Sequence, residues 1–525
     1  MIISKKHKKL VLNLRDPERI TTIIPSARAM QYKGKTLVAI PHKIDETRVL
    51  RNLGIDAPAP MGYYYDWPGR YKPFIHQKTT SEFLTLNTRA FVLNGMGSGK
   101  TVSVLWAFDY LKKLGLVKRM LVISPLSTLE RAWGDEIFRH FPELTFAVLH
   151  GDRAKRHQLL ATDFDIYIIN HDGFKNDQTV KLLNAREGLD LVVIDEVASF
   201  RNSSTDRWKA LNALVNGSKK LGTKNKEWVW GLTGTPIPNA PTDAWAQVKL
   251  INPTNAPGYF GQFRDTVMKQ AGPFGWTMRE SALDTVKAAM QPAVRFSREE
   301  CVDLPPTTFV TRQTTLTPEQ KRAFDEMLKK LKTECEGGQV TAINEAVKLG
   351  KLLQICLGVA YGTDGQVIFP NGPRVELIRE IIEESEGKVL VFVPFTGALN
   401  SLATELRKDF TVEVVQGGTS KNERDRIFKE FQNSDKTKVI VANPGTLQHG
   451  LTLTRANTII WASPTHSHEA WEQANARVTR PGQKLNTLIV SIQATAVEER
   501  IYARLKTKGK VQGSLLELIN EKGTK

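Results

Sequence analysis

The sequence predicts an α/β protein with two lobes, each built on a parallel β-sheet. Two series of short apolar runs alternate with helical stretches, one between residues 70 and 255 and the other after residue 388. Runs that are apolar at nearly every position indicate strands buried on both faces, as in parallel sheets. A chain of 525 residues also exceeds what one hydrophobic core usually supports, which favours several domains.

The expected strands form two sets, with helical stretches between neighbouring runs. In the first lobe they cover residues 90–93, 120–123, 146–149, 166–169, 191–194 and 229–232. In the second lobe they cover residues 389–393, 412–415, 439–442, 458–461 and 487–492.

Two further regions complete the expected organisation. Residues 1–60 alternate apolar runs with turns and contain a helical stretch near 45–53, which predicts a small α+β module. Residues 256–385 are more helical and include the extended Leu304-Pro305-Pro306, which predicts accessory helices and an inter-lobe linker. The expected domains are therefore 1–60, 61–255, 256–385 and 386–525, the last ending in a helix.

The charge balance favours a polyanionic partner. Lysine and arginine total 73 against 55 acidic residues, which gives a net charge of +18 and a pI near 9.6. Phosphate contacts release counterions, so a basic protein suits nucleic acid, although a merely basic surface explains the charge alone equally well.

The composition also bears on location. No apolar run is long enough to span a bilayer, and no apolar segment typical of a secretion signal precedes residue 10. The cysteines Cys301, Cys335 and Cys356 show no C-x-x-C pairing, so neither a disulfide framework nor a zinc site is indicated. We expect a soluble protein of the reducing cytoplasm, without a membrane partner.

A glycine-rich run follows the first expected strand and opens a helix. It reads Asn94-Gly95-Met96-Gly97-Ser98-Gly99-Lys100-Thr101. In such a loop backbone N–H groups approach phosphate oxygens, Lys100 reaches the β and γ phosphates, and Thr101 ligates Mg²⁺. A strict match would have glycine at position 94. The alternative is a glycine-rich turn with an incidental lysine, which the flanking strand and helix disfavour.

An acidic pair directly follows the strand expected at 191–194. A carboxylate at the carboxyl end of a parallel strand lies where ligands bind, so Asp195 is a candidate Mg²⁺ ligand and Glu196 a candidate base for the attacking water. Thr233-Gly234-Thr235-Pro236 follows another strand and brings hydroxyl groups to the same edge. Taken alone, the acidic pair is more simply interpreted as two solvated side chains at the end of a strand.

Two arginines stand near the end of a helix expected at about 468–478. Arg477 and Arg480 lie in the run Gln473-Ala474-Asn475-Ala476-Arg477-Val478-Thr479-Arg480-Pro481-Gly482-Gln483. Guanidinium groups neutralise charge on a transferring phosphoryl group. The alternative for such residues is a solvated basic face.

With these motifs in this order, the chain resembles superfamily II helicases, and among them the Swi/Snf-related double-stranded DNA translocases. The resemblance runs from about 67 to 505 and includes Leu232-Thr233-Gly234-Thr235-Pro236 and the fixed positions of the arginine run. It implies two RecA-like lobes, ATP and Mg²⁺ at the glycine-rich loop, and DNA as the partner. It also implicates Gln77, in Lys72-Pro73-Phe74-Ile75-His76-Gln77, in recognising adenine.

The resemblance further implies contacts to the DNA backbone, with little sequence preference. One candidate segment is Ser124-Pro125-Leu126-Ser127, with Trp133 and Glu136 downstream. The candidate contact residues are Ser124, Pro125, Ser127, Thr396, Thr446 and Thr452, together with the stretch 443–446.

The chain departs from the family at position 198. The usual D-E-x-H is Asp195-Glu196-Val197-Ala198, so the histidine that helps to couple the nucleotide and DNA sites is missing. Catalysis should survive because the metal ligand and the candidate base remain, but coupling would rely on other contacts.

The N-terminal module distantly resembles the substrate-recognition modules of annealing helicases and phage branch-migration proteins. Lysines 5, 6, 8 and 9 would let it grip duplex or branched DNA through phosphates. A structural cap on the first lobe is an equally good interpretation. His466 and His468 would suggest a metal site, but no third ligand accompanies them. We therefore interpret them as polar residues at the start of a helix.

Together these features predict an ATP-dependent translocase or helicase acting on duplex or branched DNA, with roles in replication, recombination or repair. A strand-separating DNA or RNA helicase would share every ATPase motif. A protein of another class, an ATP-gated DNA clamp without strong turnover, would share the binding residues but release no phosphate.

Overall fold

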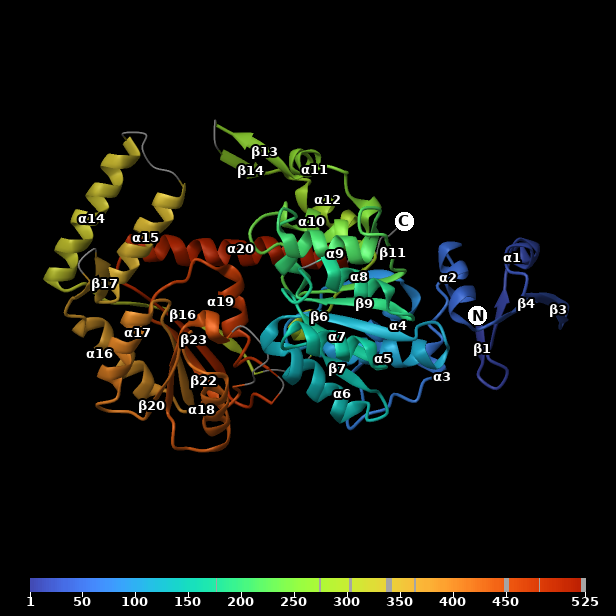
Figure 1. Cartoon of the computed structure of the whole chain (residues 1–525), viewed down its shortest axis with the longest axis horizontal. Helices are drawn as coiled ribbons and strands as arrows, with labels where there is room; N and C mark the ends of the chain where they lie inside the picture. The colour runs from blue at the N-terminus through green and yellow to red at the C-terminus, as the bar shows by residue number, and fades with distance from the viewer. Residues whose placement is uncertain are drawn as a thin grey trace. The chain divides into compact units, whose positions relative to one another are not determined.

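The computed structural model describes residues 1–525 except 176, 273–274, 302–304, 337–341, 363–364, 448–452, 481 and 521–525. The chain divides into two compact units. The first unit holds Met1–Cys301 with Ser514–Lys525, and the second holds Val302–Gly513. Each unit contains a parallel sheet covered by helices (Figure 1), which confirms the predicted fold class.

The first sheet has seven parallel strands in the order β15-β5-β12-β9-β6-β8-β7. All the strands expected in this lobe are present. The strands are β5 (Arg89–Val92), β6 (Arg119–Ser124), β7 (Phe146–Val148), β8 (Ile166–Asn170), β9 (Leu189–Asp195), β12 (Trp228–Leu232) and β15 (Ala293–Val294). The edge strand β15 lies within residues 256–385, for which the sequence predicts accessory helices and a linker. A strand of two residues is too short to show a strand pattern in the sequence.

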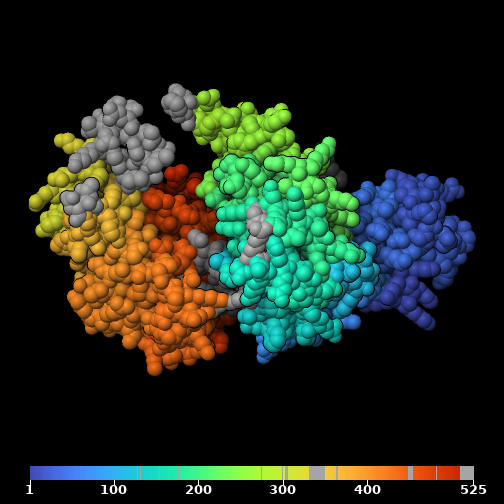
Figure 2. All heavy atoms as spheres, viewed as in Figure 1, coloured from blue at the N-terminus to red at the C-terminus, as the bar shows by residue number. Residues whose placement is uncertain are grey.

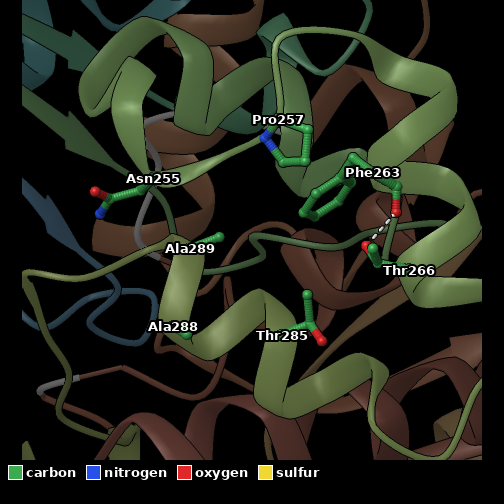
Figure 3. Close-up of a pocket in the computed structure, with 7 residues that line it drawn as sticks. All are labelled: Asn255, Pro257, Phe263, Thr266, Thr285, Ala288 and Ala289. Carbon is green, nitrogen blue, oxygen red and sulfur yellow. Dashed lines mark hydrogen bonds between the residues drawn. The ribbon is translucent and has the colours of Figure 1, made fainter.

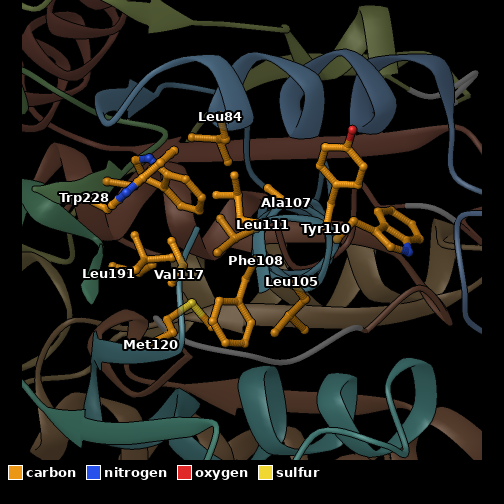
Figure 4. Packing of buried hydrophobic residues seen from close by; sticks show 14 of the residues in the cluster. Leu84, Leu105, Ala107, Phe108, Tyr110, Leu111, Val117, Met120, Leu191 and Trp228 are labelled. Atoms are coloured by element: carbon orange, nitrogen blue, oxygen red, sulfur yellow. The ribbon is translucent and has the colours of Figure 1, made fainter. Parts of the chain in front are cut away.

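The helix α5 (Lys100–Lys113) is buried along most of its length. Every residue from 102 to 111 is buried, and its apolar side chains pack with those of α4 (Ile75–Leu86) and of the sheet (Figure 4). A helix that is apolar on all sides belongs in a core. This packing holds the start of α5, and hence the glycine-rich loop, at the carboxyl end of β5.

The other helices of this α/β region are shorter. They are α6 (Asp135–His140), α7 (Arg153–Ala161), α8 (Asp177–Ala185), α9 (Asp206–Asn216) and α10 (Asp243–Ile251). Two short antiparallel strands, β10 (Gly217–Ser218) and β11 (Thr223–Asn225), follow α9. The chain then forms α11 (Phe260–Val267), the hairpin of β13 (Met268–Ala271) and β14 (Gly275–Met278), α12 (Ala282–Ala289) and α13 (Arg298–Cys301).

The N-terminal residues form an antiparallel sheet with its own small core. Its order is β1-β2-β4-β3, and Leu10, Val38 and Leu50 are fully buried in that core. The elements are β1 (Ile2–Ser4), β2 (Lys9–Asn13), α1 (Pro17–Ile23), β3 (Arg28–Tyr32), β4 (Lys35–Pro41), α2 (Ile44–Asn52) and α3 (Met61–Tyr64). In the space-filling view this module projects from one end of the first unit (Figure 2).

The second sheet has six parallel strands in the order β16-β23-β22-β19-β21-β20. All the strands expected in this lobe are present. They are β19 (Lys388–Phe392), β20 (Val412–Val415), β21 (Val439–Ala442), β22 (Ala456–Trp461) and β23 (Thr487–Gln493), with β16 (Thr307–Gln313) added at the edge. Because β16 lies at an edge with few buried side chains, its sequence resembles a linker.

Helices flank the second sheet. They are α16 (Gly372–Glu384), α17 (Thr396–Leu406), α18 (Lys421–Asn433), α19 (His468–Asn475) and the long α20 (Ala496–Asn520). An antiparallel pair, α14 (Pro318–Glu336) and α15 (Ala342–Cys356), precedes the small hairpin of β17 (Val359–Gly362) and β18 (Gly365–Ile368). Within the described residues, no helix combines the length and the apolar character needed to cross a bilayer.

Candidate functional site

The glycine-rich loop requires glycine at its end. Gly97 and Gly99 have φ of +79° and +77°, a region that side-chain-bearing residues rarely adopt. A Cβ on Gly99 would also lie 2.3 Å from Nε2 of Gln77. The backbone therefore favours glycine where the loop enters α5, and a larger residue there would displace the side chain of Gln77.

Asn94, which replaces the expected glycine, ties the loop to its surroundings. Its buried amide donates from Nδ2 to Oγ1 of Thr80 at 2.9 Å, and its Oδ1 accepts from the backbone N–H of Phe296 at 3.0 Å. The N–H of Gly95 donates to the carbonyl of Phe296 at 2.9 Å. The departure from the strict motif therefore has a structural role between α4 and the residues that follow β15.

The lysine of the loop folds back onto the loop itself. Nζ of Lys100 donates to the carbonyls of Asn94 and Gly95, at 3.0 and 3.3 Å. These contacts hold a positive charge at the start of α5, where the helix dipole and unpaired N–H groups favour an anion. Thr101, the next residue, is half-buried in the first turn of the helix.

Gln77 supports the loop from α4. Its Oε1 accepts the N–H of Phe74 at 3.0 Å, and its Nε2 donates to the carbonyl of Ser98 at 3.3 Å. His76 contacts the same carbonyl through Nε2 at 2.9 Å. The neighbouring Phe74 and Ile75 are 55 % and 84 % exposed, so apolar surface lies beside this glutamine.

Asp195 ends β9, and two donors hold one oxygen of its side chain. Oγ of Ser124 and the indole Nε1 of Trp133 reach Oδ2 at 2.9 and 3.0 Å. Trp133 is fully buried. Sequence reasoning placed Ser124 and Trp133 in a DNA-contacting segment and missed their contacts with the acidic pair, because residues 62 and 71 positions apart meet only in the folded sheet.

Glu196 has a strained backbone. Its φ of +52° is unusual for a residue with a side chain, and such strain persists only where the surroundings enforce it. Oγ1 of Thr233 lies 3.4 Å from its Oε2, and the same hydroxyl accepts the N–H of Thr235 at 3.1 Å. The left-handed turn directs the chain away from β9 at the carboxyl edge of the sheet.

The three motifs of the first unit meet at this edge. The glycine-rich loop, the acidic pair and the Thr-Gly-Thr turn follow β5, β9 and β12, which are neighbours in the sheet. A Cβ on Gly234 would lie 3.4 Å from Met96, so the turn packs against the loop. The carboxyl edge of a parallel sheet is where ligands bind in such folds.

A histidine lies beside the acidic pair, although not at position 198. His171 follows β8, and its Nε2–H donates to the backbone carbonyl of Asp195 at 2.9 Å. Burial lowers the pKa of His171, so the ring is neutral near pH 7. It packs edge-on against Phe200, with ring centroids 5.0 Å apart, while Ala198 is buried nearby in the 3₁₀ turn Val197–Phe200.

The donor set at this edge suits Mg²⁺. The oxygen donors are a carboxylate from Asp195 and a hydroxyl from Thr101, and Mg²⁺ typically takes one or two protein oxygens together with substrate phosphates. The described residues contain no cluster of three or more histidine, cysteine or acidic side chains that could hold a metal ion.

The arginine run in the second unit begins in α19 and continues beyond it. The helix ends at Asn475, so both arginines lie in the following turn. Arg477 is 3 % exposed. Nε of Arg480 donates to the carbonyl of Ala476 at 2.9 Å, which holds this side chain along the turn.

Polar residues of the same run fix the turn. Gln483 donates to the carbonyl of Ala456 at 2.7 Å and accepts from the N–H groups of Lys484 and Leu485 at 2.9 Å. Oδ1 of Asn475 accepts the indole N–H of Trp461 at 2.9 Å. These residues anchor the arginine-bearing turn to β22, and their role could not be read from the motif.

The candidate DNA contacts differ in accessibility. The side chain of Ser124 is fully buried and hydrogen-bonded to Asp195. Pro125 is also buried, whereas the adjoining Leu126 is 58 % exposed. Contacts of this segment with DNA stay a prediction.

The remaining candidate DNA contacts lie in the second unit or among the residues and side chains that the structure does not describe. Thr396 is exposed at the start of α17, and Oγ1 of Thr446 donates to the carbonyl of Asn443 at 2.7 Å. Thr452 and the side chain of Ser127 lie outside the described residues.

A pocket of about 520 Å³ lies away from these motifs. Its lining comes from α11, α12 and the segment before them, with Phe263 and Thr285 facing it (Figure 3). It contains none of the residues that the motifs single out.

Comparison with known families gives two matches, which divide the motifs between them. A family model described as the SNF2-related domain matches residues 76–357, more than half of the chain. The chain belongs to the SNF2-related family. A second model, the helicase conserved C-terminal domain, matches residues 373–482. The SNF2-related match contains the glycine-rich loop and the acidic pair, and the second match contains both arginines.

Individual relatives of this SNF2-related chain differ in size. It is 25 % identical over 453 residues to YwqA of Bacillus subtilis (strain 168). The matched region covers 82 % of this chain but only 47 % of YwqA, so the chain spans about half of that relative. It is 26 % identical over 465 residues to protein p41 of Acyrthosiphon pisum secondary endosymbiont phage 1, covering 83 % of this chain and 95 % of p41. Among solved structures, the Sulfolobus solfataricus SWI2/SNF2 ATPase core in complex with dsDNA matches with 26 % identity and a TM-score of 0.41, covering 87 % of this chain and 96 % of that one.

Proposed function

We propose that this SNF2-related protein is a DNA-dependent ATPase that moves along duplex or branched DNA. The observation that carries the proposal is the meeting of the glycine-rich loop, Asp195 and Glu196 at one carboxyl edge of the first sheet. YwqA, one of its relatives, carries the provisional name ATP-dependent helicase/translocase.

In this proposal each group of the first unit has one task. Lys100 exchanges the carbonyls it now contacts for phosphate oxygens, and the start of α5 binds the same anion. Gln77, with Phe74 beside it, receives the adenine. Mg²⁺, held by Asp195 and Thr101, would neutralise phosphate charge. Glu196 accepts a proton from the attacking water.

The second unit supplies positive charge. We assign Arg477 and Arg480 to the γ-phosphoryl group, where guanidinium groups stabilise the charge of phosphoryl transfer. In this assignment the two units close on ATP and separate after hydrolysis, because only the triphosphate engages both. Repeated closure while DNA is held by phosphates would produce movement along the duplex with little dependence on sequence.

A more specific proposal concerns the form of DNA on which the protein acts. We propose that the N-terminal module, with its exposed Lys5, Lys6 and Lys9, favours branched DNA, which would suit fork remodelling or branch migration in replication, recombination or repair. A cytoplasmic location remains part of this proposal.

The test is phosphate release by the full chain with single-stranded, duplex, forked and four-way DNA, and with RNA. Duplex or branched DNA should stimulate hydrolysis most. Glu196→Gln should lower the stimulated rate about 100-fold or more, as loss of a general base does, while nucleotide binding measured by fluorescence persists. Equally slow hydrolysis by wild type and variant would instead indicate an ATP-gated clamp.

Two further outcomes would change the substrate class. Stronger stimulation by RNA than by duplex DNA would indicate an RNA-directed motor. Efficient unwinding of a plain duplex, without displacement of a third strand from a triplex, would indicate a strand-separating helicase.

A further inference from the structure

Two hydrogen-bond donors hold one oxygen of the Asp195 carboxylate. Oγ of Ser124 and Nε1 of Trp133 both bond to Oδ2. Together these bonds restrain the rotation of the carboxylate. A side chain that rotates freely binds a metal ion less tightly, and neighbouring hydrogen-bond donors usually hold such a side chain in one orientation.

One donor, Ser124, ends β6, and the other, Trp133, lies in the turn that follows this strand. Oγ of Ser124 lies 2.7 Å from Oγ1 of Thr128, which donates to the carbonyl of Pro125 at 2.8 Å. The 3₁₀ turn Leu126–Thr128 then passes into a π-helical turn, Leu129–Gly134. Single π turns are uncommon and frequently occur at functional sites. Here the π turn carries Trp133 beneath Asp195.

The same turn also reaches the surface. Leu126 is 58 % exposed, whereas Trp133, seven positions later, is fully buried. A ligand that displaced the exposed part of the turn would therefore move Trp133 directly and would disturb Ser124 through its hydrogen bond with Thr128.

We infer that Ser124 and Trp133 are positioning residues that couple DNA bound at the 125–132 turn to metal and nucleotide binding at Asp195. This inference rests on the proposed function. Binding of duplex DNA orders the turn in the conformation that holds Oδ2, and bound Mg²⁺-nucleotide favours the same conformation. Such coupling is reciprocal, so each ligand raises the affinity for the other by the same factor.

The test measures binding without turnover. A fluorescent ATP analogue that is not hydrolysed is titrated into the full chain at several Mg²⁺ concentrations, with and without a short duplex. Trp133→Phe keeps an aromatic ring but removes the N–H donor. Because loss of a partner that orients a metal ligand typically lowers metal affinity about 10- to 100-fold, the variant should need roughly tenfold more Mg²⁺ for half-maximal binding, and duplex DNA should no longer tighten the binding.

The matched control is Trp106→Phe in α5. Trp106 is also buried, and its indole donates to the carbonyl of Pro68 at 2.7 Å, away from Asp195. This variant should lose stability but retain the Mg²⁺ requirement and the effect of DNA. If Trp133→Phe behaves like Trp106→Phe, Trp133 is only a packing residue and the inference is overturned.

A smaller change guards against misfolding. Ser124→Ala removes the other donor and should raise the Mg²⁺ requirement in the same direction, while Ser124→Thr, which restores a hydroxyl, should recover it. Wild-type Mg²⁺ dependence and DNA coupling in Ser124→Ala would contradict the inference while leaving the proposed function intact. If DNA affects neither nucleotide binding nor hydrolysis in the wild type, both proposals fail.

Discussion

At the scale of single residues, the site depends on backbone conformations that few residues adopt. Gly99 enters α5 with φ of +77°, and Glu196 leaves β9 with φ of +52°. The two cases differ, because a glycine takes this conformation at little cost whereas a glutamate does not. Strained residues are common at functional sites, and here the strain sets the direction of the chain after Asp195.

Replacing Gly99 by alanine tests this point. The variant should lose about 1–2 kcal/mol of stability from the left-handed backbone, and the new Cβ should displace Gln77, whose Nε2 lies 2.3 Å from its position. Nucleotide affinity should fall about tenfold or more, because the loop loses its support from α4. Fluorescent nucleotide titration and thermal unfolding measure the two effects.

Gly115 provides the control at the other end of the same helix. It has φ of +72°, and no atom lies within 4 Å of a Cβ built there. Gly115→Ala should therefore lower stability by a similar amount without changing nucleotide affinity. Equal affinity in the two alanine variants would show that Gln77 does not support the loop.

At the scale of elements, a buried ion pair joins two helices of the second unit. Arg374 in α16 and Glu498 in α20 lie 3.0 Å apart, with side chains 1 % and 0 % exposed. Glu498 also accepts the N–H of Ala494 at 2.8 Å. Burial and the charge of Glu498 raise the pKa of the Cys356 thiol to about 12, so this cysteine remains protonated and inert between the helices.

Breaking this pair should destabilise the second unit strongly. Glu498→Gln leaves the guanidinium of Arg374 buried without a counter-charge, which typically costs about 3–5 kcal/mol. Urea unfolding followed by the fluorescence of Trp461 and Trp471, both in that unit's core, should show a lower midpoint for the second unit.

Replacing both partners gives the contrasting result. The double change Arg374→Met and Glu498→Leu should recover most of the lost stability, since apolar side chains of similar volume often replace buried pairs at no net cost. A double variant as unstable as Glu498→Gln would show that the hydrogen bonds to the start of α20 matter more than the charges.

At the scale of the whole molecule, the net charge of +18 matters for partners more than for folding. Lys5 and Lys6 in the connection between β1 and β2, and Lys9 at the start of β2, are exposed. Nζ of Lys5 lies 5.7 Å from the centroid of the Tyr63 ring. This cation–π contact holds one of the three lysines near a fixed surface of the first unit.

The salt dependence of duplex binding should reveal those charges. If the three lysines contact phosphates, changing them together to glutamine should reduce the slope of log affinity against log salt by about 2 to 3, because each contact contributes about 0.9. Fluorescence anisotropy with a labelled duplex at several salt concentrations measures the slope.

The matched control removes the same charge elsewhere in the first unit. Lys219, Lys220 and Lys224 are exposed beside β10 and β11, and their triple glutamine variant should leave the slope almost unchanged. If the two triple variants lower the slope equally, the N-terminal module has no special part in binding.

Both sheets and the candidate catalytic motifs can be predicted from the sequence. Near-continuous apolar runs identify buried parallel strands wherever they occur, and all the expected strands are present. The glycine-rich loop, the acidic pair and the arginines are recognisable because their chemistry requires particular residue types at short spacing. The edge strands β15 and β16 escaped this reasoning, since one is very short and the other carries few buried side chains.

The contacts between distant residues became known from the fold. Ser124, Trp133 and His171 surround Asp195 because β6 and β9 are neighbours and β8 lies beside β6. Strand order sets those contacts, and local sequence does not encode strand order. For the same reason, the hydrogen bond from Ser124 to Asp195 could not be predicted from the sequence.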